Sequence, residues 1–226
     1  MEAVKGVLAL IFGEDPELRQ ILLTTLVMSV SSTCLSCLIG LPVGAAIGRR
    51  EFRGKGILLR ITSTLMGLPP VLAGLIVFLL FRSIGPFGSL HIMFSVPVMV
   101  VAQVLLITPV AVGLSASAVG ERAPLLEETA LGLGLPPLRR RALLYRECRG
   151  PFFSVALLSF GRSIAEVGAV SLVGGNIQYK TRVMTTAILL EANKGDFQKA
   201  LALGVTLMLL SLLVNIPAYS LREKLG

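Results

Sequence analysis

Long runs without a charged residue constrain this chain more than any other feature of its sequence. Ile21–Gly48 contain no charged side chain over 28 positions, and Ala200–Leu221 contain none over 22. Ile61–Phe81 are likewise free of charge, and Ser83–Gly120 contain only His91. A helix needs roughly 20 apolar residues to cross the hydrocarbon core of a bilayer. Each run is therefore long enough to be a membrane span.

The composition excludes several other classes of protein. Apolar residues make up 54% of the chain and charged residues only 15%, which is too little charge for the surface of a soluble domain. The alternation typical of an outer-membrane barrel strand is absent. The net charge of +8 gathers between the apolar runs, and no patch combines basic with aromatic residues. We therefore expect no nucleic-acid partner, and the residues predict no cofactor and no metal site.

Five spans are predicted, which makes the fold class all-α, a polytopic membrane helical bundle. Their approximate bounds are Ile21–Gly48, Ile57–Phe81, Ile92–Ser115, Phe152–Val173 and Ala200–Leu221. Before them, residues 1–20 are predicted to form a short interfacial helix on the outside, and residues 21–226 form the transmembrane domain. Pro69 and Pro70 should interrupt the second span, because proline removes a backbone hydrogen bond.

Basic residues are unequally divided between the two sides of the predicted bundle. The first loop, the third loop and the C-terminal tail contain thirteen Lys and Arg, the other side contains seven, and Arg162 lies within a span. The positive-inside rule then places the C-terminus in the cytoplasm and the N-terminus outside. The sequence thus predicts a multi-pass protein of the plasma (inner) membrane. On the outside, Val183–Leu190 are too few to span and are predicted to form an external or shallowly re-entrant helix.

The third loop, about residues 116–150, has the most informative sequence. Its apolar positions predict a short one-sided helix: Leu125, Leu126, Thr129, Ala130 and Leu133. Gly134 should end that helix, because glycine adopts left-handed backbone angles without strain. Pro136 and Pro137 should open a second, basic helix, since proline is tolerated at the first helical position. A rigid corner on the cytoplasmic face is expected.

This corner resembles the EAA loop of the permease subunits of ATP-binding-cassette (ABC) importers. The match is Glu128-Thr129-Ala130 followed by three residues and then Gly134. Thr129 occupies the first alanine position of the family motif, and Arg146-Glu147 replace a downstream Leu-Pro. In that family the loop fits a cleft of the ATPase, so the resemblance implies that Glu128 anchors the helix, Ala130 permits close approach and Gly134 makes the turn. The implied ATPase-coupling residues are Glu127, Glu128, Thr129, Ala130 and Gly134.

The fourth predicted span contains two charged residues. Arg162 lies about 17 Å along a helix that enters the membrane near Pro151, and Glu166 follows four residues later. Residues four apart share a helix face, so the two side chains are predicted to neutralise each other. The sequence leaves open whether this pair is structural or lines a transport path. The transport-path candidates are Arg162, Glu166, Gly168 and Asn176.

The stretch from Arg162 to Ile188 contains Ala165-Glu166-Val167-Gly168-Ala169 and Gly175-Asn176-Ile177. It resembles the oxyanion branch of ABC importer permeases, with tungstate permeases the most similar and molybdate permeases more distant. The resemblance implies an importer subunit for an oxyanion that works by alternating access, and likeness alone implies that the oxyanion is tungstate. It also implies a homodimer in membrane lipid, a cytoplasmic ABC ATPase subunit and an external substrate-binding protein. The chain has no Walker-type phosphate loop, so we expect ATP hydrolysis in the partner and no enzyme activity here.

Two alternatives remain open at this point. One is an ABC permease for molybdate or another small solute. The other, from a different class, is an ATP-independent secondary transporter, for which an inverted repeat or several intramembrane carboxylates would be the sign. The chain shows no repeat and one such carboxylate, Glu166.

Overall fold

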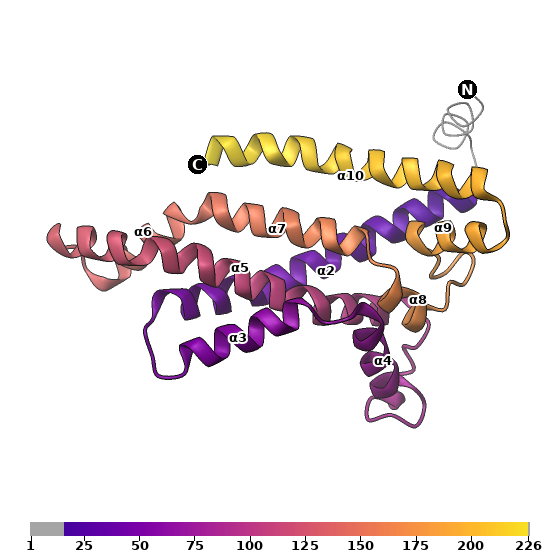
Figure 1. Cartoon of the computed structure of the whole chain (residues 1–226), viewed down its shortest axis with the longest axis horizontal. Coiled ribbons are helices and arrows are strands. Elements are labelled where there is room, and N and C mark those ends of the chain that lie inside the picture. Colours follow the sequence, from indigo (N-terminus) through magenta and orange to yellow (C-terminus); the bar gives the residue numbers. More distant parts are fainter. Residues whose placement is uncertain (1–15, 226) are drawn as a thin grey trace. The chain divides into compact units, whose positions relative to one another are not determined.

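The computed structural model describes residues 16–225 (Figure 1). Side chains are described as far as Ile216. All regular structure within those residues is helical, as predicted: α2 (Pro16–Arg49), α3 (Lys55–Met66), α4 (Pro70–Phe81), η1 (Gly88–Leu90), α5 (Val96–Gly132), α6 (Pro137–Glu147), α7 (Arg149–Ile164), α8 (Gly168–Gly174), α9 (Met184–Asn193) and α10 (Phe197–Leu225). The all-α class is confirmed. The predicted N-terminal helix falls mostly outside the described residues, and residues 16–20 already belong to α2.

The helices coincide in position with the five predicted spans, but two of those spans are broken. The helices α2, α5 and α10 are long and apolar enough to cross a membrane. The number rises to five if the bent pairs α3 with α4 and α7 with α8 each form one span. The predicted interruption at Pro69 and Pro70 is confirmed, since α3 ends at Met66 and α4 begins at Pro70.

The chain divides into two compact units, which we describe separately. Within the described residues, the first unit comprises residues 16–32, 69–105 and 160–215, and the second comprises residues 33–68, 106–159 and 216–225. In the first unit α4 packs against α8. A core of buried side chains there joins α2, α9 and α10: Leu18, Ile21, Met184, Ala187 and Leu203. The short helix predicted near residues 183–190 is thus confirmed as α9.

In the second unit a glycine stripe lets α2 and α5 approach closely. Gly40, Gly44 and Gly48 are spaced four apart, so they share one face of α2. A Cβ atom at Gly44 would overlap Ser115 and the Val112 carbonyl of α5. Small residues at this spacing hold membrane helices together by close packing, because lipid offers no hydrophobic driving force between helices.

Candidate functional site

The end of α5, the turn after it and the start of α6 form a corner, residues 127–137, which we call the coupling corner. The helix α5 runs unbroken from Val96 to Gly132, so the prediction of a separate short helix after the third span was wrong. Pro109 and Pro124 lie inside this helix and do not end it. The corner is therefore the tip of the same helix that supplies the third span.

The predicted turn at Gly134 is confirmed, together with its chemistry. Gly134 has a φ of 67°. The Leu135 N–H donates to the Ala130 carbonyl at 3.0 Å, and the Gly134 N–H donates to the Leu131 carbonyl at 2.9 Å. These two bonds make the Schellman motif, which satisfies the last carbonyls of a helix. After it α6 begins at Pro137, as predicted.

The five predicted coupling residues divide between the surface and the interior of this corner. Glu128 and Thr129 are exposed, and the Thr129 hydroxyl donates to the Leu125 carbonyl. Glu127 forms an ion pair with Arg49 at 3.5 Å. Ala130 is buried within its own chain at 1% exposure, so its small size serves packing inside the subunit.

Exposed leucines add an apolar surface to the coupling corner. The side chains of Leu131, Leu133 and Leu138 are exposed by 58%, 70% and 77%. The expectation of a one-sided apolar helix included Leu133 but did not predict that this surface is exposed. Large exposed apolar groups beside a carboxylate are typical of a surface that contacts another protein.

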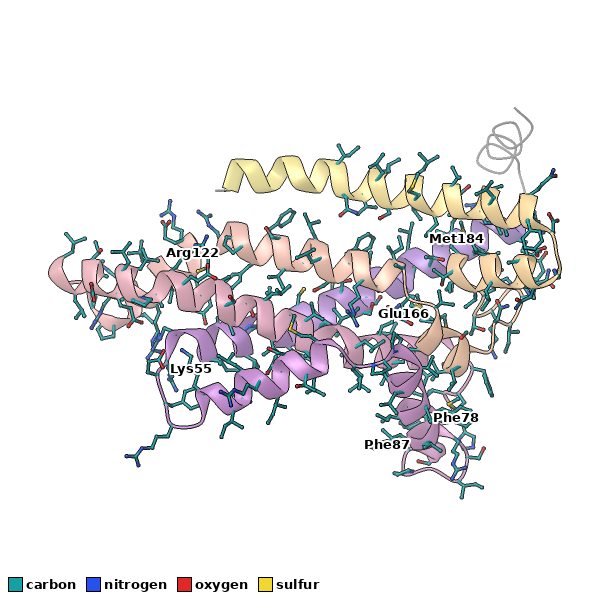
Figure 2. The ribbon with its side chains drawn as sticks, in the orientation of Figure 1. Lys55, Phe78, Phe87, Arg122, Glu166 and Met184 are labelled. Atoms are coloured by element: carbon teal, nitrogen blue, oxygen red, sulfur yellow. The ribbon has the colours of Figure 1, made fainter. Side chains whose placement is uncertain are left out.

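The predicted ion pair between Arg162 and Glu166 is not formed. The helix α7 ends at Ile164 and α8 begins at Gly168, which leaves a helix break at residues 165–167. Arg162 and Glu166 therefore do not lie on one continuous helix, and the four-residue spacing does not place their side chains on a shared face. Figure 2 labels Glu166 at this break. The Arg162 Nε is buried and has no hydrogen-bond partner among the residues that the structure describes.

Side chains from distant parts of the chain satisfy the backbone at the helix break. The amide of Gln103 on α5 donates to the Ser163 carbonyl at 2.9 Å. The Glu166 carboxylate accepts from the Ala169 N–H at 3.1 Å, which favours the start of α8 because a negative charge is stabilised there. The Thr185 hydroxyl on α9 donates to the Glu166 carbonyl at 2.8 Å. A membrane helix tolerates a break only where such partners replace the missing backbone bonds.

A buried hydroxyl–amide cluster beside the break was not predicted. The hydroxyls of Ser32 and Ser163 both donate to the Gln103 side-chain oxygen and lie 2.8 Å from each other. The signal was present in the sequence, since Thr25, Ser29 and Ser32 recur every three or four residues along an otherwise apolar span. All three are buried in the first unit.

The other two transport-path candidates lie at either end of α8. A Cβ atom at Gly168 would lie 3.0 Å from a Val71 methyl group, so this glycine allows α8 to pack against α4. Asn176 follows α8 with a φ of 50° and accepts a hydrogen bond from Arg182 at 3.3 Å. Among the described residues, no hydrogen bond or ion pair links any two of the four candidates.

Ion pairs in the same unit join α9 and the segment before it to α2 and α10. Arg182 pairs with Glu17, and the Glu191 carboxylate contacts Lys194 at 3.0 Å and Lys199 at 3.5 Å. Burial alone would raise the pKa of the Glu191 carboxyl, but the hydrogen bond from Lys194 and the charge of Lys199 outweigh it. The pKa of Glu191 therefore lies below its ordinary value.

Comparison with known proteins identifies the family. Residues 40–225 match the family described as "Binding-protein-dependent transport system inner membrane component". The chain is 33% identical to the tungstate uptake system permease protein of Peptoclostridium acidaminophilum, over 99% of this chain and 98% of that protein. It is 34% identical to the protein of the same description in Campylobacter jejuni, over 98% and 93%.

A third relative, the molybdenum transport system permease protein of Azotobacter vinelandii, is 28% identical over 88% of this chain and 92% of its own. The family match covers more than half of the chain, and it agrees with the apolar spans that the structure describes. The chain therefore belongs to the family of inner membrane components of binding-protein-dependent transport systems, and it is a multi-pass membrane permease subunit.

Proposed function

We propose that this permease imports a tetrahedral oxyanion and that tungstate is its cargo. The observation that carries the proposal is Arg162, whose charge lies in a predicted span and is not neutralised by Glu166. An unpaired cation inside a membrane domain costs free energy, so it is retained where it serves a function. An anion that crosses a region of low dielectric would find its nearest opposite charge there. The relatives named for tungstate uptake support the choice of anion.

Molybdate is the second candidate for the cargo. It is also a tetrahedral oxyanion of the same charge, and the Azotobacter relative is named for molybdenum transport. A secondary transporter without an ATPase is less well supported, because the family is described by its dependence on a binding protein.

The partners follow from this proposal. A cytoplasmic ABC ATPase would bind the coupling corner through Glu128, Thr129 and the exposed leucines, and an external binding protein would deliver the anion. Because α5 is one continuous helix, a displacement of its end at the coupling corner would also move the third span. Five spans enclose little space, so two copies of the chain would form the path. Exposed apolar residues on α2, α4 and α10 would face lipid or the second copy.

We propose the orientation that the positive-inside rule predicts, with the N-terminus outside and the C-terminus in the cytoplasm. In a variant that lacks the native cysteines, an impermeant thiol reagent applied to intact cells should label Cys substituted at Lys180 and spare Cys substituted at Gly54. The reverse pattern would contradict this orientation.

The experiment that tests the function uses the permease reconstituted with its ATPase and its binding protein. Binding protein loaded with tungstate should stimulate ATP hydrolysis above the unloaded protein, with molybdate weaker and sulfate weakest. Arg162→Lys should keep part of the tungstate response and Arg162→Leu should lose it. No stimulation by any of the three anions would refute an oxyanion cargo, and a preference for sulfate would refute tungstate.

A further inference from the structure

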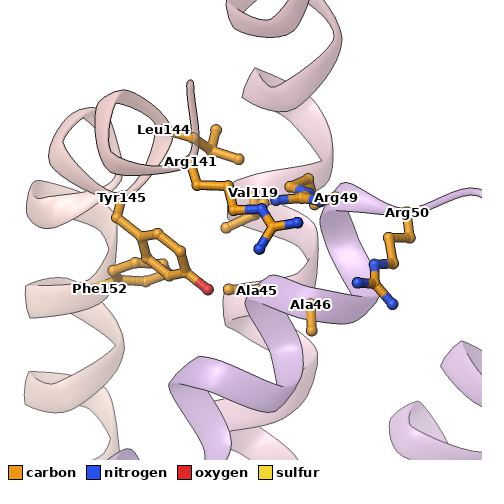
Figure 3. A pocket seen from close by; sticks show the side chains of 9 residues that line it. All are labelled: Ala45, Ala46, Arg49, Arg50, Val119, Arg141, Leu144, Tyr145 and Phe152. Atoms are coloured by element: carbon orange, nitrogen blue, oxygen red, sulfur yellow. The ribbon is translucent and has the colours of Figure 1, made fainter. Parts of the chain in front are cut away.

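A basic pocket in the second unit lies where α2 ends and where α6 approaches α7. It encloses about 500 Å³ together with its open mouth. Three arginines contribute to its wall, Arg49 and Arg50 from the end of α2 and Arg141 from α6. Figure 3 shows the Arg141 guanidinium and the Tyr145 hydroxyl directed toward the same space above Ala45.

The charge of this pocket is not balanced by the chain itself. Arg49 has a carboxylate partner, Glu127, at 3.5 Å. No acidic residue lines the pocket, and neither Arg50 nor Arg141 forms an ion pair with any residue between positions 16 and 216. The first two turns of α6 contain three consecutive arginines and no acidic residue. The three arginines have one carboxylate partner between them, so the pocket has a net positive charge that would favour an anion.

The remaining wall of the pocket is apolar. Leu144, Phe152 and Val119 also line it, and the rings of Tyr145 and Phe152 contact each other with centroids 6.2 Å apart. The guanidinium group presents parallel N–H donors that match the oxygens of a phosphate. An anionic head with an apolar body would therefore use both parts of the wall.

We propose that this pocket binds a phosphate group, and that the group belongs to the headgroup of an anionic phospholipid. The pocket lies at the end of the spanning helix α2, whose last residue is Arg49, and basic pockets between membrane helices on the cytoplasmic side bind anionic lipid headgroups. The positive-inside rule explains why arginines lie on this side, but it requires neither a shared pocket nor an apolar floor. This proposal does not depend on the identity of the cargo.

The test measures binding to the full-length purified permease. Native mass spectrometry would count phosphatidylglycerol and phosphatidylcholine molecules retained in detergent, and the shift of the melting temperature would report inorganic phosphate at constant ionic strength. We compare the wild type with Arg141→Gln, with Arg141→Lys and with Arg139→Gln. Arg139 is an exposed arginine of α6 that does not line the pocket. Each variant should elute from a sizing column like the wild type.

We expect the wild type to bind phosphatidylglycerol about tenfold more tightly than phosphatidylcholine, a ratio that one charge-assisted contact would supply. Arg141→Gln should lose that preference. Arg141→Lys should keep part of the preference and Arg139→Gln should keep all of it. Stabilisation by inorganic phosphate alone, abolished by Arg141→Gln, would identify a free anion as the source of the phosphate. The proposal is wrong if Arg141→Gln and Arg139→Gln bind the two lipids alike. It is also wrong if Arg141→Gln leaves lipid binding unchanged and only weakens association with the ATPase, because an acidic side chain of that partner would then occupy the pocket.

Discussion

The coupling corner and the helix break are both places where a helix ends, but the hydrogen-bond donors to the freed carbonyl groups come from different parts of the chain. At the corner, the carbonyls of Ala130 and Leu131 accept from backbone N–H groups a few residues away. At the break, the Ser163 carbonyl accepts from the nearby Glu166 N–H, but the carbonyls of Ser163 and Glu166 also accept from the side chains of Gln103 and Thr185, which lie on α5 and α9. The corner depends on local turn chemistry, and the break adds tertiary contacts to its local bonds.

This difference has a consequence for what each region can do. The corner keeps its shape without help from the rest of the chain, so it can act as a rigid surface for a partner. The break keeps its shape only while α5, α7 and α9 stay together, so a movement of any of these helices would alter it. Substitutions should therefore act locally at the corner and on the whole first unit at the break.

The largest effect on folding is expected from Gln103→Leu. This change removes the amide that contacts Ser32 and Ser163 and leaves buried polar groups without that partner, at a cost of about 1–3 kcal/mol of stability. The amount of folded protein in detergent and its melting temperature should both fall. Gln198→Leu, at an exposed position of α10, is the control and should change neither. If Gln103→Leu leaves the melting temperature unchanged, the cluster does not hold the break.

A smaller effect on stability, with a large effect on transport, is expected from Gly134→Val. A β-branched residue at a φ of 67° adds about 1–2 kcal/mol of backbone strain and should displace the turn. A Cβ atom at Gly134 or at Gly132 would meet no neighbour, so Gly132→Val, in regular helix, is a matched control. Uptake should fall at least tenfold for Gly134→Val, with normal membrane insertion, and should persist for Gly132→Val. Equal uptake by the two variants would show that the shape of the turn is unimportant.

The absence of an ion pair at the break makes a third, smaller prediction. If Arg162 and Glu166 were partners, the double change to leucine would restore the folded protein that either single change loses. Because the structure shows no ion pair between them, the double variant should not regain the folded protein that either single change loses. Recovery of folded protein in the double variant would mean that the two charges neutralise each other.

The smallest effect is expected at α9, which supplies Thr185 to the break. The folded-state pKa of Glu191 lies below its ordinary value of 4.5. Its ion pairs therefore contribute stability above that value, and the contribution is lost as the pH falls through the lower, folded-state pKa. Glu191→Gln should lower the melting temperature slightly at pH 7, and the difference from the wild type should shrink below about pH 4.5. A difference that is constant with pH would exclude the carboxylate as its cause.

The sequence predicted those features whose physical cause is local. Charge-free runs located α2, α5 and α10, the helices long and apolar enough to cross a membrane, and the bent pair α3 with α4. Gly134 with Pro136 and Pro137 located the turn and the start of α6. The sequence could not show that Ala165–Val167 break the fourth span, because no glycine or proline stands there and the stabilising partners are more than 15 residues away along the chain. The sequence also predicted an ion pair between Arg162 and Glu166 from their helical spacing, and the helix break removes that spacing.

Burial also escaped prediction at the coupling corner. Ala130 and Leu133 both appeared to belong to one apolar face, yet Ala130 is buried and Leu133 is 70% exposed. Their environment depends on how α5 and α6 pack in the second unit, which residue spacing alone does not determine. The exposed leucines were therefore missed as a contact surface.

The account rests above all on the coupling corner as the point where ATP hydrolysis drives transport. Glu128 is an exposed carboxylate at this corner, and Glu121 is an exposed carboxylate two turns earlier on α5, where it accepts a hydrogen bond from Ser117. The most direct test measures uptake and ATP hydrolysis together in proteoliposomes for Glu128→Ala and Glu121→Ala. We predict that Glu128→Ala loses uptake while remaining inserted, through weaker ATPase binding or uncoupled hydrolysis, and that Glu121→Ala retains both activities. Wild-type uptake by Glu128→Ala would contradict the account.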